Sequence, residues 1–127
     1  MRRAVVWLLL WLAAGPAMAL AAELPVAADL RMDGDQARRE LLPILVFFAS
    51  LSCPYCYEVE ELYLKPRLAS GEYRNQVIMW VVYTDGAQSM QDFRDRQTDH
   101  AAFARRYGVT FTPTIKMVDA DGVELVP

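Results

Sequence analysis

The chain has few of the residues from which metal sites and nucleic-acid-binding surfaces are built. Its 127 residues include one histidine and two cysteines, which excludes a metal site with several histidine ligands. Thirteen basic residues stand against 16 acidic ones, and no basic run is longer than two residues. A nucleic-acid-binding surface therefore has no electrostatic support. Internal repeats and low-complexity tracts are also missing, so the cysteine pair carries most of the chemical information.

Hydrophobic residues, by contrast, are abundant. They make up 54% of the chain, and charged residues make up 23%, a balance that argues against intrinsic disorder. The length fits one domain and leaves little room for a second.

The first residues have the layout of a secretory signal peptide. Two arginines precede an eleven-residue apolar run at residues 4–14, which is followed by a helix-breaking Gly-Pro pair and small residues. An apolar run of this length is too short to cross ~30 Å of hydrocarbon comfortably. We therefore expect removal of residues 1–21, with cleavage near Ala19 or Ala21, and a periplasmic location. Disulfides persist in that compartment.

After the signal peptide, the sequence predicts a lead-in segment at residues 22–42 and one domain at residues 43–127. In the lead-in segment, a turn at Asp33-Gly34-Asp35 is expected to cap a short helix at residues 36–41. Continuous apolar runs indicate strands that are buried on both faces. The elements expected in the domain are strands at residues 43–49, 77–83, 114–118 and 123–126, a helix from Cys53 to Gly71 divided at Pro66, a surface loop or partial helix at residues 84–98, and a helix at residues 100–107 capped by Asp99.

This alternation predicts an α/β fold, a mixed sheet with helices on both faces. We expect Phe47, Phe48 and Trp80 in the core and His100 at the surface, at the start of its helix. In the helix that follows Cys53, the spacing predicts one apolar face and one solvent-facing acidic face. The apolar face contains Val59, Leu62 and Tyr63, and the acidic face contains Glu58, Glu60 and Glu61.

The two cysteines lie where a buried strand gives way to a helix. Cys53 opens the helix, and Pro54 takes the first helical position, where a missing N–H costs nothing. The free N–H groups and the dipole of a helix N-terminus favour thiolate over thiol. Cys53 is therefore expected to be the exposed nucleophile, and Cys56, one turn deeper, the thiol that resolves a mixed disulfide. A purely structural disulfide explains the pair poorly, because the loop that it closes is tiny.

Other uses of the two sulfurs stay open at this point. One is an inert pair. Another is a metal site: structural zinc needs four ligands, and beyond the sulfurs only His100 and carboxylates remain, whereas copper(I) accepts two soft thiolates. The chain would then be a copper(I)-handling metallochaperone. A redox-inactive binding module on the same scaffold is a further alternative.

Two motifs together resemble the thioredoxin superfamily. One is the CPYC sequence that follows the strand at residues 43–49, and the other is a Thr-Pro pair directly before the strand at residues 114–118. The resemblance covers residues 43–126 and implies a thioredoxin-like fold, in which a cis-proline loop packs against the active-site disulfide. The residues that it assigns to the active site are Cys53 and Cys56 as catalytic residues, and Pro54, Tyr55, Thr112 and Pro113 as supporting or substrate-binding residues.

Within the superfamily the chain is most similar to small exported thioredoxin-like proteins, including those of bacterial sulfur-oxidation systems and one-domain periplasmic reductases. The Thr before the proline resembles the Dsb isomerase and reductase branch. This resemblance implies a monomeric thiol–disulfide oxidoreductase that reduces or exchanges disulfides of exported proteins. It implies no cofactor and no metal, and a membrane protein as the electron-transfer partner. The chain has no room for the N-terminal dimerisation domain of the isomerases of this branch, which favours a reductase.

The chain departs from the family pattern in two ways. Phe47 lies six residues before Cys53, where thioredoxins carry a buried acid, so proton transfer needs water or a nearby carboxylate, for which Glu58 is the candidate. The family fold also ends with a helix that this chain, ending at Pro127, does not supply. We therefore expect either a truncated sequence or an incompletely covered sheet near Phe47, Val81 and Ile115, and hence marginal stability.

Overall fold

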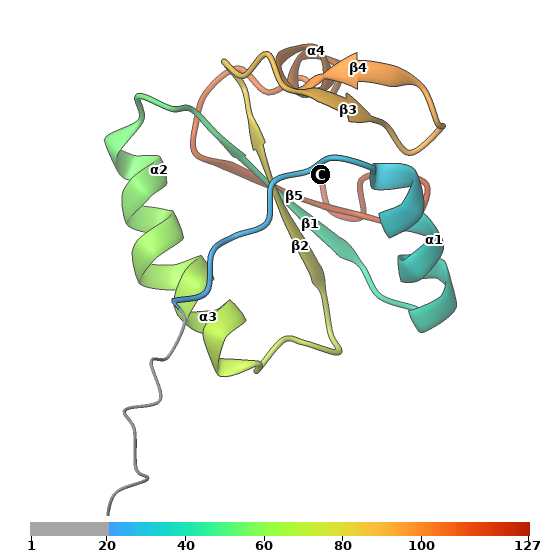
Figure 1. The fold of residues 1–127 in the computed structure, drawn as a ribbon, viewed down its shortest axis with the longest axis horizontal. Coiled ribbons are helices and arrows are strands. Elements are labelled where there is room, and N and C mark those ends of the chain that lie inside the picture. Colours follow the sequence, from blue (N-terminus) through green and yellow to red (C-terminus); the bar gives the residue numbers. More distant parts are fainter. Residues whose placement is uncertain (1–20) are drawn as a thin grey trace, which may run out of the picture.

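A computed structural model describes residues 21–127 (Figure 1). The expected signal peptide lies outside these residues apart from its last position. Among the described residues no helix is long and apolar enough to span a membrane. The elements in chain order are α1 (Leu30–Glu40), β1 (Ile44–Ala49), α2 (Pro54–Val59), the π-helix η1 (Glu60–Leu64), α3 (Lys65–Ser70), β2 (Ile78–Tyr83), β3 (Ser89–Gln91), β4 (Gln97–Asp99), α4 (His100–Arg106) and β5 (Thr114–Val118).

The central sheet is mixed, as the sequence predicts. Its strand order is β2-β1-β5, with β1 parallel to β2 and antiparallel to β5. The middle strand, β1, is the continuous apolar run, and five of its six residues are buried. Upstream of α1, the chain extends the sheet along β2, where the Ala27 N–H donates to the Val81 carbonyl at 3.0 Å.

Two hydrophobic cores lie on opposite faces of this sheet. Successive side chains of a strand point to opposite faces, so the neighbours Phe47 and Phe48, both fully buried, belong to different cores. Phe48 packs with Phe103 of α4 at a ring-centroid distance of 6.2 Å. Phe47 shares its core with Leu64 of η1. Figure 1 shows α2 and α3 on one side of the sheet and α1 on the other, which confirms the expected helices on both faces.

Helix α1 is longer than the sequence predicts. It begins at Leu30 rather than at residue 36, and the Asp29 side chain caps it by accepting the Met32 N–H at 3.0 Å. The expected turn at residues 33–35 is therefore wrong. Gly34 is buried inside the helix, where a Cβ atom would collide with the Ala120 carbonyl oxygen. This glycine permits close packing of the helix and does not turn the chain.

Asp33 of the same helix predicts a pH-dependent stability. Burial, followed by the charge of Asp29, raises its pKa to about 6, and its buried Oδ2 has no hydrogen-bond partner among the described residues. A folded-state pKa above the unfolded value means that the protonated carboxyl favours folding. This contribution is present below about pH 4 and is lost as the pH rises through about 6.

Asp33→Asn is therefore expected to stabilise the protein by about 1–2 kcal/mol at pH 7.5 and by almost nothing at pH 4, after a discount for the partial exposure of the side chain. Urea denaturation of both proteins at pH 7.5 and at pH 4 measures this difference in the free energy of unfolding. Asp35→Asn is the matched control, because the Asp35 side chain is 44% exposed and paired with Arg31 and Arg38. An Asp33→Asn effect that is equal at both pH values would contradict the prediction.

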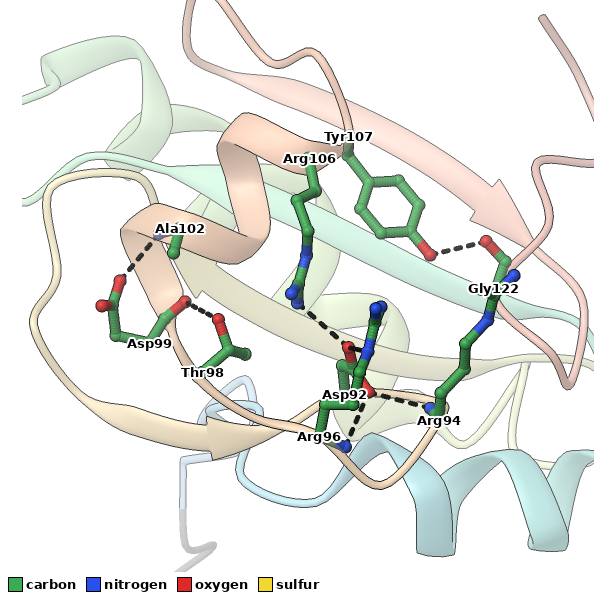
Figure 2. Close-up of polar contacts among 9 residues, drawn as sticks. All are labelled: Asp92, Arg94, Arg96, Thr98, Asp99, Ala102, Arg106, Tyr107 and Gly122. Atoms are coloured by element: carbon green, nitrogen blue, oxygen red, sulfur yellow. Dashed lines mark hydrogen bonds and ion pairs between the residues drawn. The ribbon is translucent and has the colours of Figure 1, made fainter.

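The polar stretch at residues 84–98 forms neither a plain loop nor a partial helix. It contains most of a hairpin of β3 and β4, and Asp92 ties its turn to α4 (Figure 2). This buried carboxylate accepts the Arg94 and Arg96 N–H groups at 2.9 and 3.0 Å, and it pairs with the Arg96 and Arg106 guanidinium groups at 2.9 and 3.1 Å. Burial alone would raise the pKa of Asp92, but these hydrogen bonds and the Arg96 charge hold it below its usual value.

The helix after Cys53 is divided, as expected from Pro66, but its buried face differs from the prediction. The five residues of η1 form a π-helical turn, which suits the position because Pro66 has no N–H to donate to the preceding turn. The wider turn rotates the face that follows it. Leu62 and Tyr63 are exposed, and Leu64 is buried instead. Glu60, four residues after the buried Cys56, has a side chain that is only 18% exposed, so its expected solvent-facing position is wrong.

Downstream of β5 the expected fourth strand is replaced by a single bridge between Val118 and Glu124. No helix follows β5 within residues 119–127. The prediction of an incompletely covered sheet is wrong for Phe47 and Val81. The α2–α3 region and the lead-in segment bury both side chains fully. It holds for Ile115 on the edge strand, which is 47% exposed.

Candidate redox site

The two cysteines form a disulfide at the N-terminus of α2. Their Cα atoms are 5.2 Å apart. Cys53 caps the helix, its Sγ accepts the Cys56 N–H at 3.1 Å, and Pro54 occupies the first helical position, as the sequence predicts. Cys53 is partly exposed, whereas Cys56 is 2% exposed. The two sulfurs thus differ in access to a large reaction partner.

The sheet brings the second motif to the same end of the molecule. Phe48, near the end of β1, pairs with Thr114, the first residue of the antiparallel β5. The segment before Thr114 and the segment after Phe48 therefore leave the sheet at the same edge. The Thr112–Pro113 bond is cis, which agrees with the resemblance. Two motifs more than fifty residues apart in the sequence become neighbours because β1 and β5 are antiparallel.

Asp85 anchors the loop between β1 and Cys53, and the sequence analysis did not identify it. Its carboxylate accepts the Leu51 N–H at 3.1 Å and the Ser50 hydroxyl at 2.8 Å. These two bonds lower the pKa of Asp85. Asp85 follows β2 closely, and parallel strands end at the same edge of a sheet. An acidic residue just after the strand parallel to β1 is the sequence signal that could have found it.

Apolar side chains next to the disulfide in the sequence are left open to solvent. Leu51, Tyr55 and Phe111 are each more than 70% exposed. Leu51 lies in the loop before Cys53, Tyr55 between the cysteines as expected, and Phe111 directly before Thr112. Exposed side chains of this size mark contact surfaces when they gather at one place.

Beneath the site, His100 is fully buried, so its expected surface position is wrong. Its Nδ1 accepts the Tyr83 N–H at 3.0 Å, and its Nε2 lies 2.8 Å from the Ala27 carbonyl oxygen. A carbonyl only accepts, so Nε2 carries the proton and the ring is neutral. The ring also stacks on Tyr83 at 6.3 Å between centroids. Both partners are tertiary contacts, which helix periodicity does not reveal.

Metal-binding alternatives gain no support from the described part of the chain. Within residues 21–127 no group of three or more histidine, cysteine or acidic side chains is placed to hold a metal ion. Cys53 and Cys56 are bonded to each other in this structure. The copper-handling alternative therefore rests on the two sulfurs alone.

The comparison with known families agrees with this geometry. Residues 30–126 match the thioredoxin-like domain family, and the chain belongs to that family. Together with the Cys53–Cys56 disulfide, membership supports a thiol–disulfide oxidoreductase. The substrates of such a protein carry disulfides.

Solved structures show the same fold at low sequence identity. A DsbH oxidoreductase is 19% identical, with a TM-score of 0.59 over 91% of this chain and 78% of that chain. A poplar thioredoxin h is 15% identical, with a TM-score of 0.52 over 79% of each chain. The thioredoxin NaTrxh from Nicotiana alata is 16% identical, with a TM-score of 0.51 over 84% of this chain and 83% of that chain. No curated protein sequence matches the chain.

Proposed function

We propose that the protein is a periplasmic thiol–disulfide oxidoreductase that reduces or exchanges the disulfides of exported proteins. The observation that carries the proposal is the unequal exposure of the two bonded sulfurs, with Cys53 partly open to solvent and Cys56 buried beside it. The signal-like N-terminus supports export. The DsbH oxidoreductase, which is similar in fold, is named for the same kind of chemistry.

The reduced pair would act in two steps. The Cys53 thiolate attacks one sulfur of a substrate disulfide, forms a mixed disulfide and releases the other substrate sulfur as a thiolate. The Cys56 thiol then loses its proton and attacks the Cys53 sulfur, which releases the second substrate thiolate. The substrate gains two electrons, and the Cys53–Cys56 disulfide is left. A dithiol donor must reduce this disulfide again, a role that we assign to a membrane protein.

Polypeptide substrates suit the surface around Cys53. Leu51, Tyr55 and Phe111 present large apolar groups beside the site, and burial of such groups against a substrate chain is favourable. Pro54, Thr112 and Pro113 would support the site and contact the substrate backbone, as the resemblance implies. These contacts require no second copy of the chain, and we propose a monomer.

A redox titration of the purified protein, with and without copper(I), tests this function. A defined two-electron dithiol potential, together with catalysed reduction of a protein disulfide such as that of insulin, is the expected result. Tight retention of copper(I) without turnover would favour the metallochaperone, and neither property would favour the redox-inactive module. Recovery of the protein from the periplasmic fraction with Leu20 or Ala22 at its N-terminus is the expected result for export.

A further inference from the structure

A cluster of charged side chains lies under the helix that carries the cysteines. The Lys65 ammonium contacts the carboxylates of Glu23 at 2.8 Å, Glu61 at 2.5 Å and Glu60 at 3.5 Å. Lys65 and Glu60 are largely shielded, with side-chain exposures of 17% and 18%, whereas Glu23 is 73% exposed. The cluster therefore runs from a shielded carboxylate to the solvent.

Glu60 is placed one helical turn beyond Cys56. Its N–H donates to the Cys56 carbonyl, and residues four apart on a helix share a face with Cβ atoms about 6 Å apart. Cys56 itself lies in the apolar core that also contains Phe47 and Leu64. Glu58, the acidic residue that the sequence favoured as a proton acceptor, is exposed and lies two positions from Cys56.

Tyr83 lies on the sheet side of the core around Cys56. This last residue of β2 packs against the apolar core that holds Cys56. Burial raises the pKa of its phenol, and so does the negative charge of Glu60, while Lys65 opposes the shift. The Tyr83 ring also stacks on the neutral His100.

The exchange reaction requires a proton acceptor at this position. Cys56 attacks as a thiolate, so its thiol must first lose a proton, yet it is 2% exposed and water has little access to it. The hydrophobic core that contains Cys56 also contains Phe47 and Leu64, with Tyr83 packed against it. Glu60 is the shielded carboxylate on the same helix face.

We propose that Glu60 accepts the proton of Cys56 during resolution of the mixed disulfide. Lys65 pairs with the Glu60 carboxylate, and the cluster opens to solvent at the exposed Glu23. In the reverse direction Glu60 returns a proton to Cys56 when the disulfide is reduced. The proposal rests on the thiol–disulfide chemistry of the pair and requires no particular physiological substrate.

Reaction of the reduced full-length protein with the aromatic disulfide DTNB, followed by stopped flow, separates the two steps. Attack by Cys53 releases the first thionitrobenzoate, and resolution by Cys56 releases the second. In Glu60→Gln the second phase is expected to slow at least about ten-fold near pH 7. It should recover as the pH rises toward the pKa of an unassisted thiol, while the first phase stays unchanged. Glu60→Asp, which keeps the carboxylate, should restore most of the rate.

The matched controls are Glu61→Gln, which also removes a carboxylate partner of Lys65, and Glu58→Gln, which removes an exposed charge. Both should keep the wild-type pH profile of the second phase. A thermal melt of each variant reports any loss of folding. A Glu60→Gln profile equal to wild type, or an equal shift in Glu61→Gln, would overturn the proposal. If the protein failed to reduce exported proteins but still released thionitrobenzoate in two phases with the expected Glu60→Gln effect, only the proposed function would be contradicted.

Discussion

Cys56→Ser is expected to accumulate covalent complexes with substrate proteins, and Cys53→Ser is expected to abolish exchange without forming them. Cys53 is the partly exposed sulfur at the helix N-terminus, and Cys56 is 2% exposed one turn deeper. Only Cys53 is placed to attack a large disulfide partner. Without Cys56 the mixed disulfide has no internal thiol to resolve it.

Non-reducing electrophoresis and mass spectrometry of periplasmic extracts measure this trapping. The double serine variant is the control for non-covalent association and should show no reducible complexes. Rapid alkylation by iodoacetamide should modify Cys53 first in the reduced protein. Equal trapping by both single variants, or faster labelling of Cys56, would show that the two roles are assigned wrongly.

His100→Ala is expected to lower the free energy of unfolding by about 2–5 kcal/mol. The substitution leaves the Tyr83 N–H and the Ala27 carbonyl without their observed partner, and each buried unpaired group costs about 1–3 kcal/mol. It also leaves a cavity between α4 and β2. Chemical denaturation of the oxidised protein, with the disulfide intact, measures the loss.

Two variants make this measurement specific to the hydrogen bonds. His100→Gln keeps a donor near the Nε2 position but no acceptor at Nδ1, so it should retain part of the stability. Arg105→Ala on the exposed side of the same helix should change stability by less than about 0.5 kcal/mol. If His100→Ala were no more destabilising than Arg105→Ala, the buried histidine would not join the lead-in segment, β2 and α4 as the structure indicates.

The hairpin and the charged cluster show why part of the molecule escaped sequence interpretation. Strands β3 and β4 have only three residues each, too few for a clear period of two. The buried carboxylate of Asp92 pairs with Arg106, which lies on another element. The charged cluster likewise depends on Glu23, which reaches Lys65 from the lead-in segment.

The sequence by itself determined the parts of this protein that rest on local pattern. Continuous apolar runs predicted β1 and β2, Asp99 predicted the start of α4, and the CPYC sequence after a strand indicated the redox pair. Only the tertiary structure decided which shielded groups surround that pair. Asp85 and His100 take their positions, and Lys65 its partner Glu23, from contacts with segments far away in the chain. Hydrogen bonds and ion pairs of this kind have no sequence period, so the chain must fold before they exist.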